Sequence, residues 1–181
     1  MSLTWFVIRG SGIVAFGLLT ASLVWGLMVS SKVLGRAVKA KGLQWLHESL
    51  GLGALLATVV HVVAVWLDEF IEFTWLDILL PGAAEWEPLA TALGVVGLWT
   101  LAIVSLSFYV KRWIGQSAWR FMHYLSFGAF LAALSHGAIA GTDTGNPMLV
   151  GLYLSSLVAV VMLTAIRVLT SREPKSRPSL G

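Results

Sequence analysis

Five long stretches with almost no charged residues dominate this sequence. Each is close to the roughly 20 residues that a helix needs to cross a hydrocarbon core of about 30 Å. Of the 181 residues, 57% are hydrophobic and 12% are charged, which leaves too little polar surface for a soluble domain of this size. We therefore expect an all-α, polytopic membrane helix bundle, with spans at about 11–31, 43–67, 88–110, 119–141 and 146–167.

The expected organisation is one transmembrane domain over residues 11–170. Residues 1–10 form a short lead-in at the outer interface. Residues 171–181 form a polar, proline-containing tail that we expect to be disordered and cytoplasmic. The segment Phe70–Gly82 is too short to span, and its mixture of aromatic, aliphatic and acidic residues predicts an amphipathic piece on the outer face.

The chain contains no cysteine. This excludes disulfides, thiolate metal sites, iron–sulfur ligation and covalent attachment of a c-type heme. The net charge of +3 is small, and the basic residues gather on one side of the expected membrane, so we expect no nucleic-acid partner. The expected partner is the lipid bilayer itself.

Eleven of the twelve Lys and Arg residues fall in three regions, which are residues 32–41, residues 111–120 and the chain from residue 167 onward. The connection from Asp68 to Glu87 holds six acidic residues and no basic one. By the positive-inside rule, the three basic regions are cytoplasmic. Five spans then place the N-terminus outside and the C-terminus in the cytoplasm, in an expected bacterial plasma membrane.

All four histidines fall in the second and fourth expected spans, as His47 and His61 and as His123 and His136. His47 and His123 follow basic residues of the cytoplasmic side by six and three positions. His61 and His136 each lie seven residues before an acid on the outer side. The two spans run in the same direction, so His47 is level with His123 and His61 with His136. At 1.5 Å per residue, the two levels are about 20 Å apart.

Two stacked b-type hemes with bis-histidine ligation would need this arrangement, with the four histidines as axial ligands of the heme irons. Neutral imidazole is a good axial ligand, and two of them saturate the iron for electron transfer. The plainer alternative is that these are interfacial or helix-bridging histidines. A zinc site is disfavoured because each level offers only two nitrogens.

Helical geometry complicates one of the two histidine spans. Fourteen steps along a straight helix leave His47 and His61 about 40° apart, whereas thirteen steps leave His123 and His136 about 140° apart. The last two do not share a face of a straight helix. Either a distortion near Gly128 helps, or the two hemes approach this helix from different sides.

The paired spacing, with thirteen residues between one pair and twelve between the other, resembles the ferric reductase-like transmembrane domain. That domain is shared by NADPH oxidases, iron reductases and a bacterial methionine sulfoxide reductase system. The resemblance covers roughly residues 5–170. It extends to Trp119-Arg120-Phe121-Met122-His123-Tyr124, to the run from His136 to Thr144, to Arg9-x-x-Gly12 and to the LLPG sequence before the third span.

The resemblance implies two heme b groups held between the second and fourth spans, the inner by His47 and His123 and the outer by His61 and His136. Larger members have six spans and a cytosolic flavin and nicotinamide domain, whereas we expect five spans and no flavin domain here. Electrons would then come from a separate protein or from quinol. This chain, as a component of an oxidoreductase, would pass them to an acceptor at the outer side. Two alternatives stay open: a heme-bearing anchor subunit of a larger redox complex, and a heme-free packing or transport subunit.

Arg9 is the one basic residue on the expected outer side, and it is the candidate partner for the propionates of the outer heme. An interfacial anchor is the alternative for this side chain. Glycines near the histidines could let a flat macrocycle approach the backbone, or could serve ordinary packing of membrane helices. They are Gly12, Gly17, Gly51, Gly53, Gly128 and Gly137.

Overall fold

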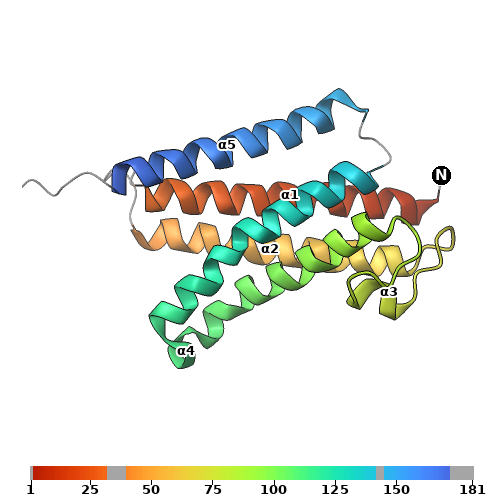
Figure 1. The fold of residues 1–181 in the computed structure, drawn as a ribbon, viewed down its shortest axis with the longest axis horizontal. Helices are drawn as coiled ribbons and strands as arrows, with labels where there is room; N and C mark the ends of the chain where they lie inside the picture. The colour runs from red at the N-terminus through yellow and green to blue at the C-terminus, as the bar shows by residue number, and fades with distance from the viewer. Residues whose placement is uncertain (1, 32–39, 142–144, 172–181) are drawn as a thin grey trace, which may run out of the picture.

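The computed structural model describes residues 2–31, 40–141 and 145–171, and this part of the chain is helical and contains no strand (Figure 1). Four of the helices are long and apolar enough to cross a membrane, so the expected all-α fold and membrane character are confirmed. The elements are α1 (Leu3–Ser30), α2 (Ala40–Trp66), the short α3 (Trp75–Leu79), α4 (Pro88–Ala140) and α5 (Pro147–Ser171).

Helix α4 holds two of the five expected spans. A straight helix of its 53 residues would be about 80 Å long, more than twice the thickness of a bilayer core. Gly115 interrupts the helix with φ 81° and ψ 162°, a conformation that is essentially restricted to glycine. The chain reverses there, so that Gly97 lies against Ala132. We call the segments before and after Gly115 the first and second limbs of α4, and Figure 1 shows them as a hairpin.

With α4 counted as two limbs, the chain runs five times between two ends of the molecule. The start of α1, segment 67–87, the end of α4 and the start of α5 gather at one end in Figure 1. The bend at Gly115 and the last turn of α5 lie toward the other end. This alternation agrees with the predicted order of inner and outer connections.

Helix α1 starts earlier than expected. Ser2 caps it by accepting a hydrogen bond from the backbone N–H of Trp5, so residues 3–10 extend the first helix by about two turns. Thr4 donates to Asp68 at 3.0 Å and ties this added turn to the end of α2. A lead-in is expected here because Arg9 interrupts the uncharged stretch, which then begins at Ser11.

The bundle core forms where α1 meets α2, the second limb of α4, and α5. Phe16 of α1 stacks on Phe130 of the second limb, with ring centroids 5.8 Å apart, and both are buried beside Val160 of α5. A second cluster joins Leu19 to Ala54 and Ala129. The outward faces of the helices carry large exposed apolar side chains, as a lipid-facing surface requires.

The segment between α2 and α4 folds over the end of the bundle at which α1 begins. Helix α3 begins with a capping box, in which Thr74 and Asp77 each bond the other's backbone N–H. Trp75 stacks on Trp66 of α2, and the indole of Trp99 donates to the carbonyl of Leu79. These contacts hold Ile78 buried. The predicted disordered tail lies almost wholly in 172–181, outside the described residues, as do the basic residues of 32–39.

Candidate functional site

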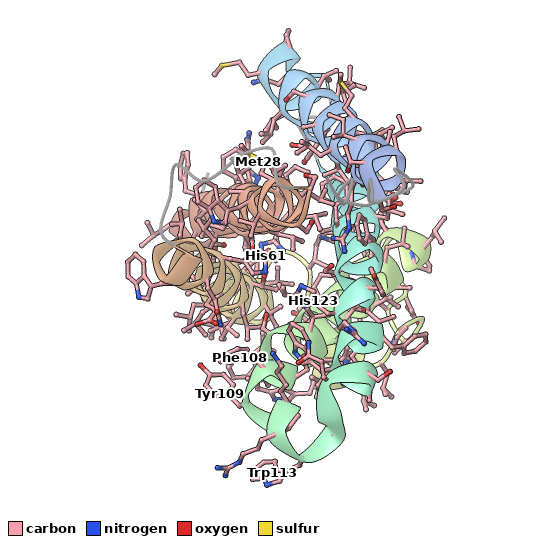
Figure 2. The ribbon with its side chains drawn as sticks, turned by 90° about the vertical axis from the view of Figure 1, so that its left-hand side faces the viewer. Met28, His61, Phe108, Tyr109, Trp113 and His123 are labelled. Carbon is pink, nitrogen blue, oxygen red and sulfur yellow. The ribbon has the colours of Figure 1, made fainter. Side chains whose placement is uncertain are left out.

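The four histidines meet as two pairs between α2 and the second limb of α4. The ring centroids of His47 and His123 are 5.8 Å apart, and those of His61 and His136 are 6.2 Å apart. Within each pair the rings are nearly perpendicular, at 78° and 80°. Figure 2, viewed along the bundle, shows His61 and His123 pointing into the space between the α1–α2 pair and α4. The pairing is the one that residue depth predicted.

The spacing within each pair suits two imidazoles on opposite sides of one metal ion. A bond from imidazole nitrogen to a metal is about 2 Å long, and the nitrogen lies about 1 Å from its ring centre. Two such ligands in line therefore place their centroids roughly 6 Å apart. No third His, Asp or Glu of the described residues joins either pair in a group that could hold a metal ion. Each pair thus offers two nitrogen ligands and no more.

Three of the four rings are oriented by a backbone carbonyl. The Nδ1 atoms of His61, His136 and His47 lie 2.8, 2.8 and 2.9 Å from the carbonyl oxygens of Ile8, Ala90 and Ser22. A carbonyl only accepts, so each Nδ1 carries the proton and donates it. In the neutral ring, Nε2 then keeps its lone pair for a ligand bond. This is how metal-binding histidines are commonly fixed.

A glycine follows four residues after each of these carbonyls. Ile8 is followed by Gly12, Ser22 by Gly26 and Ala90 by Gly94. A Cβ atom at these glycines would lie 3.1, 3.0 and 2.9 Å from the nearest atom of the ring that they face. In a helix, residues four apart lie on the same face. A side chain at the second position would therefore press against the imidazole, and at Gly94 it would force the ring to shift. We call each carbonyl–glycine pair a ring seat.

The ring seats account for Gly12 but not for the other glycines that the sequence singled out. Gly17 and Gly128 face open space, whereas Gly51 and Gly53 pack against Ser22 and Leu18 in ordinary helix contact. Gly26 and Gly94 are not among the glycines that the sequence singled out, because their contacts with the rings join different helices. A search for small residues on the neighbouring spans, at the depth of each histidine, could have found them.

The angular problem on the second histidine helix is resolved by its path. The only non-helical residue within α4 is Gly115, so no break at Gly128 turns the rings toward one side. Figure 1 shows that the second limb crosses α1 and α2 obliquely, from below α2 to above α1. In this view α2 lies on one flank of the limb near its start and on the other flank near its end. Two rings on different sides of the limb can therefore both face α2.

The outer pair lines a cavity of about 1090 Å³. Its walls come from α1, α2, both limbs of α4, α5 and the segment after α2. Its volume is at the upper end of the roughly 300–1,000 Å³ that is usual for small-molecule and cofactor sites. Arg9 lines it, with its guanidinium 4.2 Å from the ring centre of Trp5. Tyr153 also lines it and touches the face of Gly137.

His123 is positioned differently from the other three histidines. No ring seat serves it among the described residues. Instead its ring stacks on Trp119, one turn earlier in the second limb, with centroids 5.0 Å apart and an angle of 20° between the planes. Lys111 of the first limb places its ammonium 4.1 Å from the centre of the Trp119 ring. The inner pair therefore lies beside positive charge, whereas acids lie close to the outer pair's cavity.

Comparisons of this sequence with models of protein families, with curated proteins and with solved structures found no match. The resemblance to the ferric reductase-like domain thus rests on the motifs quoted above and stays a hypothesis.

Proposed function

We propose that this protein is a membrane cytochrome that binds two b-type hemes, one between His47 and His123 and one between His61 and His136, and carries electrons across the bilayer. The observation that supports this best is the geometry of the pairs. Two levels repeat the same spacing of about 6 Å between imidazoles, as two ligands on one iron require. Interfacial or helix-bridging histidines have no reason to pair twice in this way.

The residues around the pairs fit a heme. Heme iron with two imidazole ligands supplies one-electron transfer without an open position for substrate. The ring seats hold three imidazoles in the tautomer that leaves Nε2 available. They also make each imidazole a stronger donor to a metal, because the Nδ1–H bond to a carbonyl raises ligand basicity.

Electrons would enter from a cytoplasmic donor or from quinol and leave to an acceptor at the outer side. The two levels are separated by about 20 Å along α2, so together they span most of a hydrocarbon core. The acidic segment after α2 covers the outer end and would favour a positively charged acceptor. In this proposal the chain is the membrane component of an oxidoreductase and relies on a separate partner.

The test is heme quantitation on the purified protein. We expect two hemes per chain by pyridine hemochrome and iron analysis, with a reducible b-type absorption spectrum. His61→Ala or His136→Ala should remove one heme, and His47→Ala or His123→Ala should remove the other. A protein that folds with no heme would overturn the proposal and favour a packing or transport subunit.

The pairing itself is tested by the double variants. The double variant His61→Ala/His136→Ala should lose one heme, because both substitutions affect the same site. His47→Ala with His136→Ala should lose both hemes. If the second combination still retains one heme, the histidines pair across the levels, and the assignment of inner and outer sites is wrong.

A further inference from the structure

Trp119 has a buried indole nitrogen with no hydrogen-bond partner among the described residues. A buried donor of this kind is costly unless another group accepts its hydrogen bond. The ring of Trp119 stacks directly on His123, so the unpartnered N–H belongs to the immediate surroundings of the inner histidine pair. An acceptor bound at this pair would satisfy it.

Positive charge is brought to the same place by the bend of α4. Residues 111 and 119 would lie about 12 Å apart along a continuous helix. Because the chain reverses at Gly115, the ammonium of Lys111 instead lies over the Trp119 ring at 4.1 Å. Arg167 of α5 also lies near enough for its charge to act on His123, and its guanidinium is held by a 2.7 Å bond to Ser30. The acceptor should therefore be an anion.

A second tryptophan near the same bend, Trp113, shows how a tryptophan with a cation over its ring is placed at the surface. Trp113 has Arg112 over its ring at 4.4 Å, yet its side chain is 70% exposed. Figure 2 shows it pointing away from the bundle at the tip of α4. Trp119 also has a cation over its ring, that of Lys111, but its indole nitrogen is buried and its ring faces a histidine. The location of Trp119 suits a ligand inside the bundle better than a lipid headgroup.

We propose that Trp119 and Lys111 form the carboxylate site of the inner heme, with the indole N–H donating to a propionate and the ammonium balancing its charge. This inference rests on the proposed function, since it assigns residues to one of the two hemes. It also explains why His123 needs no ring seat. The stacked indole would hold the imidazole and the propionate at the same time.

The experiment is a redox titration of the purified two-heme protein, with the inner heme identified as the one that His123→Ala removes. Trp119→Phe keeps an aromatic ring but removes the donor, and Lys111→Gln removes the charge. Loss of either should lower the midpoint potential of the inner heme, because the reduced state carries less positive charge and depends more on nearby cations. Trp113→Phe and Arg112→Gln are the matched controls and should leave both potentials unchanged.

Infrared difference spectra between oxidised and reduced protein supply a direct signature. The carboxylate bands that respond to reduction of the inner heme should shift in Trp119→Phe and not in Trp113→Phe. Selective loss of the inner heme in Trp119→Phe, with the outer heme retained, would also support the site. Unchanged potentials and unchanged carboxylate bands with both hemes present would overturn it. Loss of bound phospholipid from Trp119→Phe without a carboxylate shift would overturn it in favour of a lipid phosphate.

The outcome for this site can be told apart from the outcome for the proposed function. A wild-type protein without heme refutes both. A protein with two hemes whose potentials do not respond to Trp119→Phe or Lys111→Gln refutes the carboxylate site alone.

Discussion

At the scale of single residues, a helical carbonyl and the glycine four positions later form the same seat for three histidine rings. The carbonyl already accepts the helical hydrogen bond of that glycine's own N–H, and it can accept a second because it has two lone pairs. A Cβ atom at the glycine would crowd the ring, which lies 2.8–2.9 Å from the carbonyl oxygen, and at Gly94 the ring would have to shift. The seat thus sets the tautomer, the orientation and the depth of each imidazole at once.

Gly94→Ala should selectively weaken the outer site. A Cβ atom there would lie 2.9 Å from both Nδ1 and Cε1 of His136, so the ring must shift and its bond to Ala90 must lengthen. We expect heme content to fall from two toward one per chain, measured by pyridine hemochrome. Gly128→Ala is the control in the same helix, because nothing lies within 4 Å of its Cβ position. Equal heme loss in both variants would contradict the seat.

Arg9→Ala should lower the midpoint potential of the outer heme or weaken its retention. The potential and the retention of the inner heme should not change. Arg9 lines the cavity of the outer pair, and the sequence offers no other cation on that side. Propionates near Asp68 and Glu69 would be repelled without a positive partner. Redox titration of the variant measures the effect. Unchanged potentials for both hemes would show that Arg9 is an interfacial anchor.

At the scale of elements, the reversal of α4 decides what surrounds the histidines. The first limb supplies the seat for His136 through Ala90 and Gly94, and it delivers Lys111 to the inner level. Both contributions depend on the angle at which the two limbs leave Gly115. A single uninterrupted helix would place neither group near a histidine of the second limb.

Gly115→Ala should destabilise the hairpin. Its φ of 81° with ψ of 162° lies in a region that side chains avoid, and forcing alanine into it costs about 1–3 kcal/mol. We expect a lower free energy of unfolding in detergent, measured by denaturant titration, and partial loss of heme. Gly128→Ala is again the control, since alanine is favoured over glycine in a regular helix. An unchanged free energy of unfolding would show that the bend tolerates another conformation.

At the scale of the whole molecule, five passes arrange the two histidine levels between a basic end and an acidic end. The bend at Gly115 and the end of α5 carry basic residues, while the connection from α2 to α4 carries acids. The four apolar helices, one of them folded in two, make this an integral membrane protein. The two levels therefore lie in different electrostatic surroundings.

The topology prediction is that the N-terminus is outside and the C-terminus is in the cytoplasm. The distribution of Lys and Arg, with eleven of twelve on one side, is the physical reason. Reporter fusions at the two ends, or labelling of single introduced cysteines in the cysteine-free chain, measure it. Labelling of a cysteine at Gly115 only from outside the cell would refute the orientation and the proposed direction of transfer.

Much of this architecture could be predicted from the sequence. Hydrophobic length determines the five passes, because a bilayer core admits only apolar helices of about 20 residues. Flanking charges determine depth, so the sequence alone predicts that His47 and His123 lie at one level and His61 and His136 at the other. These inferences succeed because the membrane imposes one axis, along which helical rise converts residue number into position.

The tertiary structure decided how the helices are rotated and how they cross one another, which position along that axis does not determine. The sequence does not show how α4 crosses α2. On a straight helix His123 and His136 lie about 140° apart, which argues against both rings facing α2. Packing of Phe130 and Ala129 against α1 and α2 sets that crossing. The seats at Gly26 and Gly94, and the approach of Lys111 to Trp119, join residues of different helices. Such contacts depend on helix rotation and crossing angle, which side-chain packing determines and hydropathy does not.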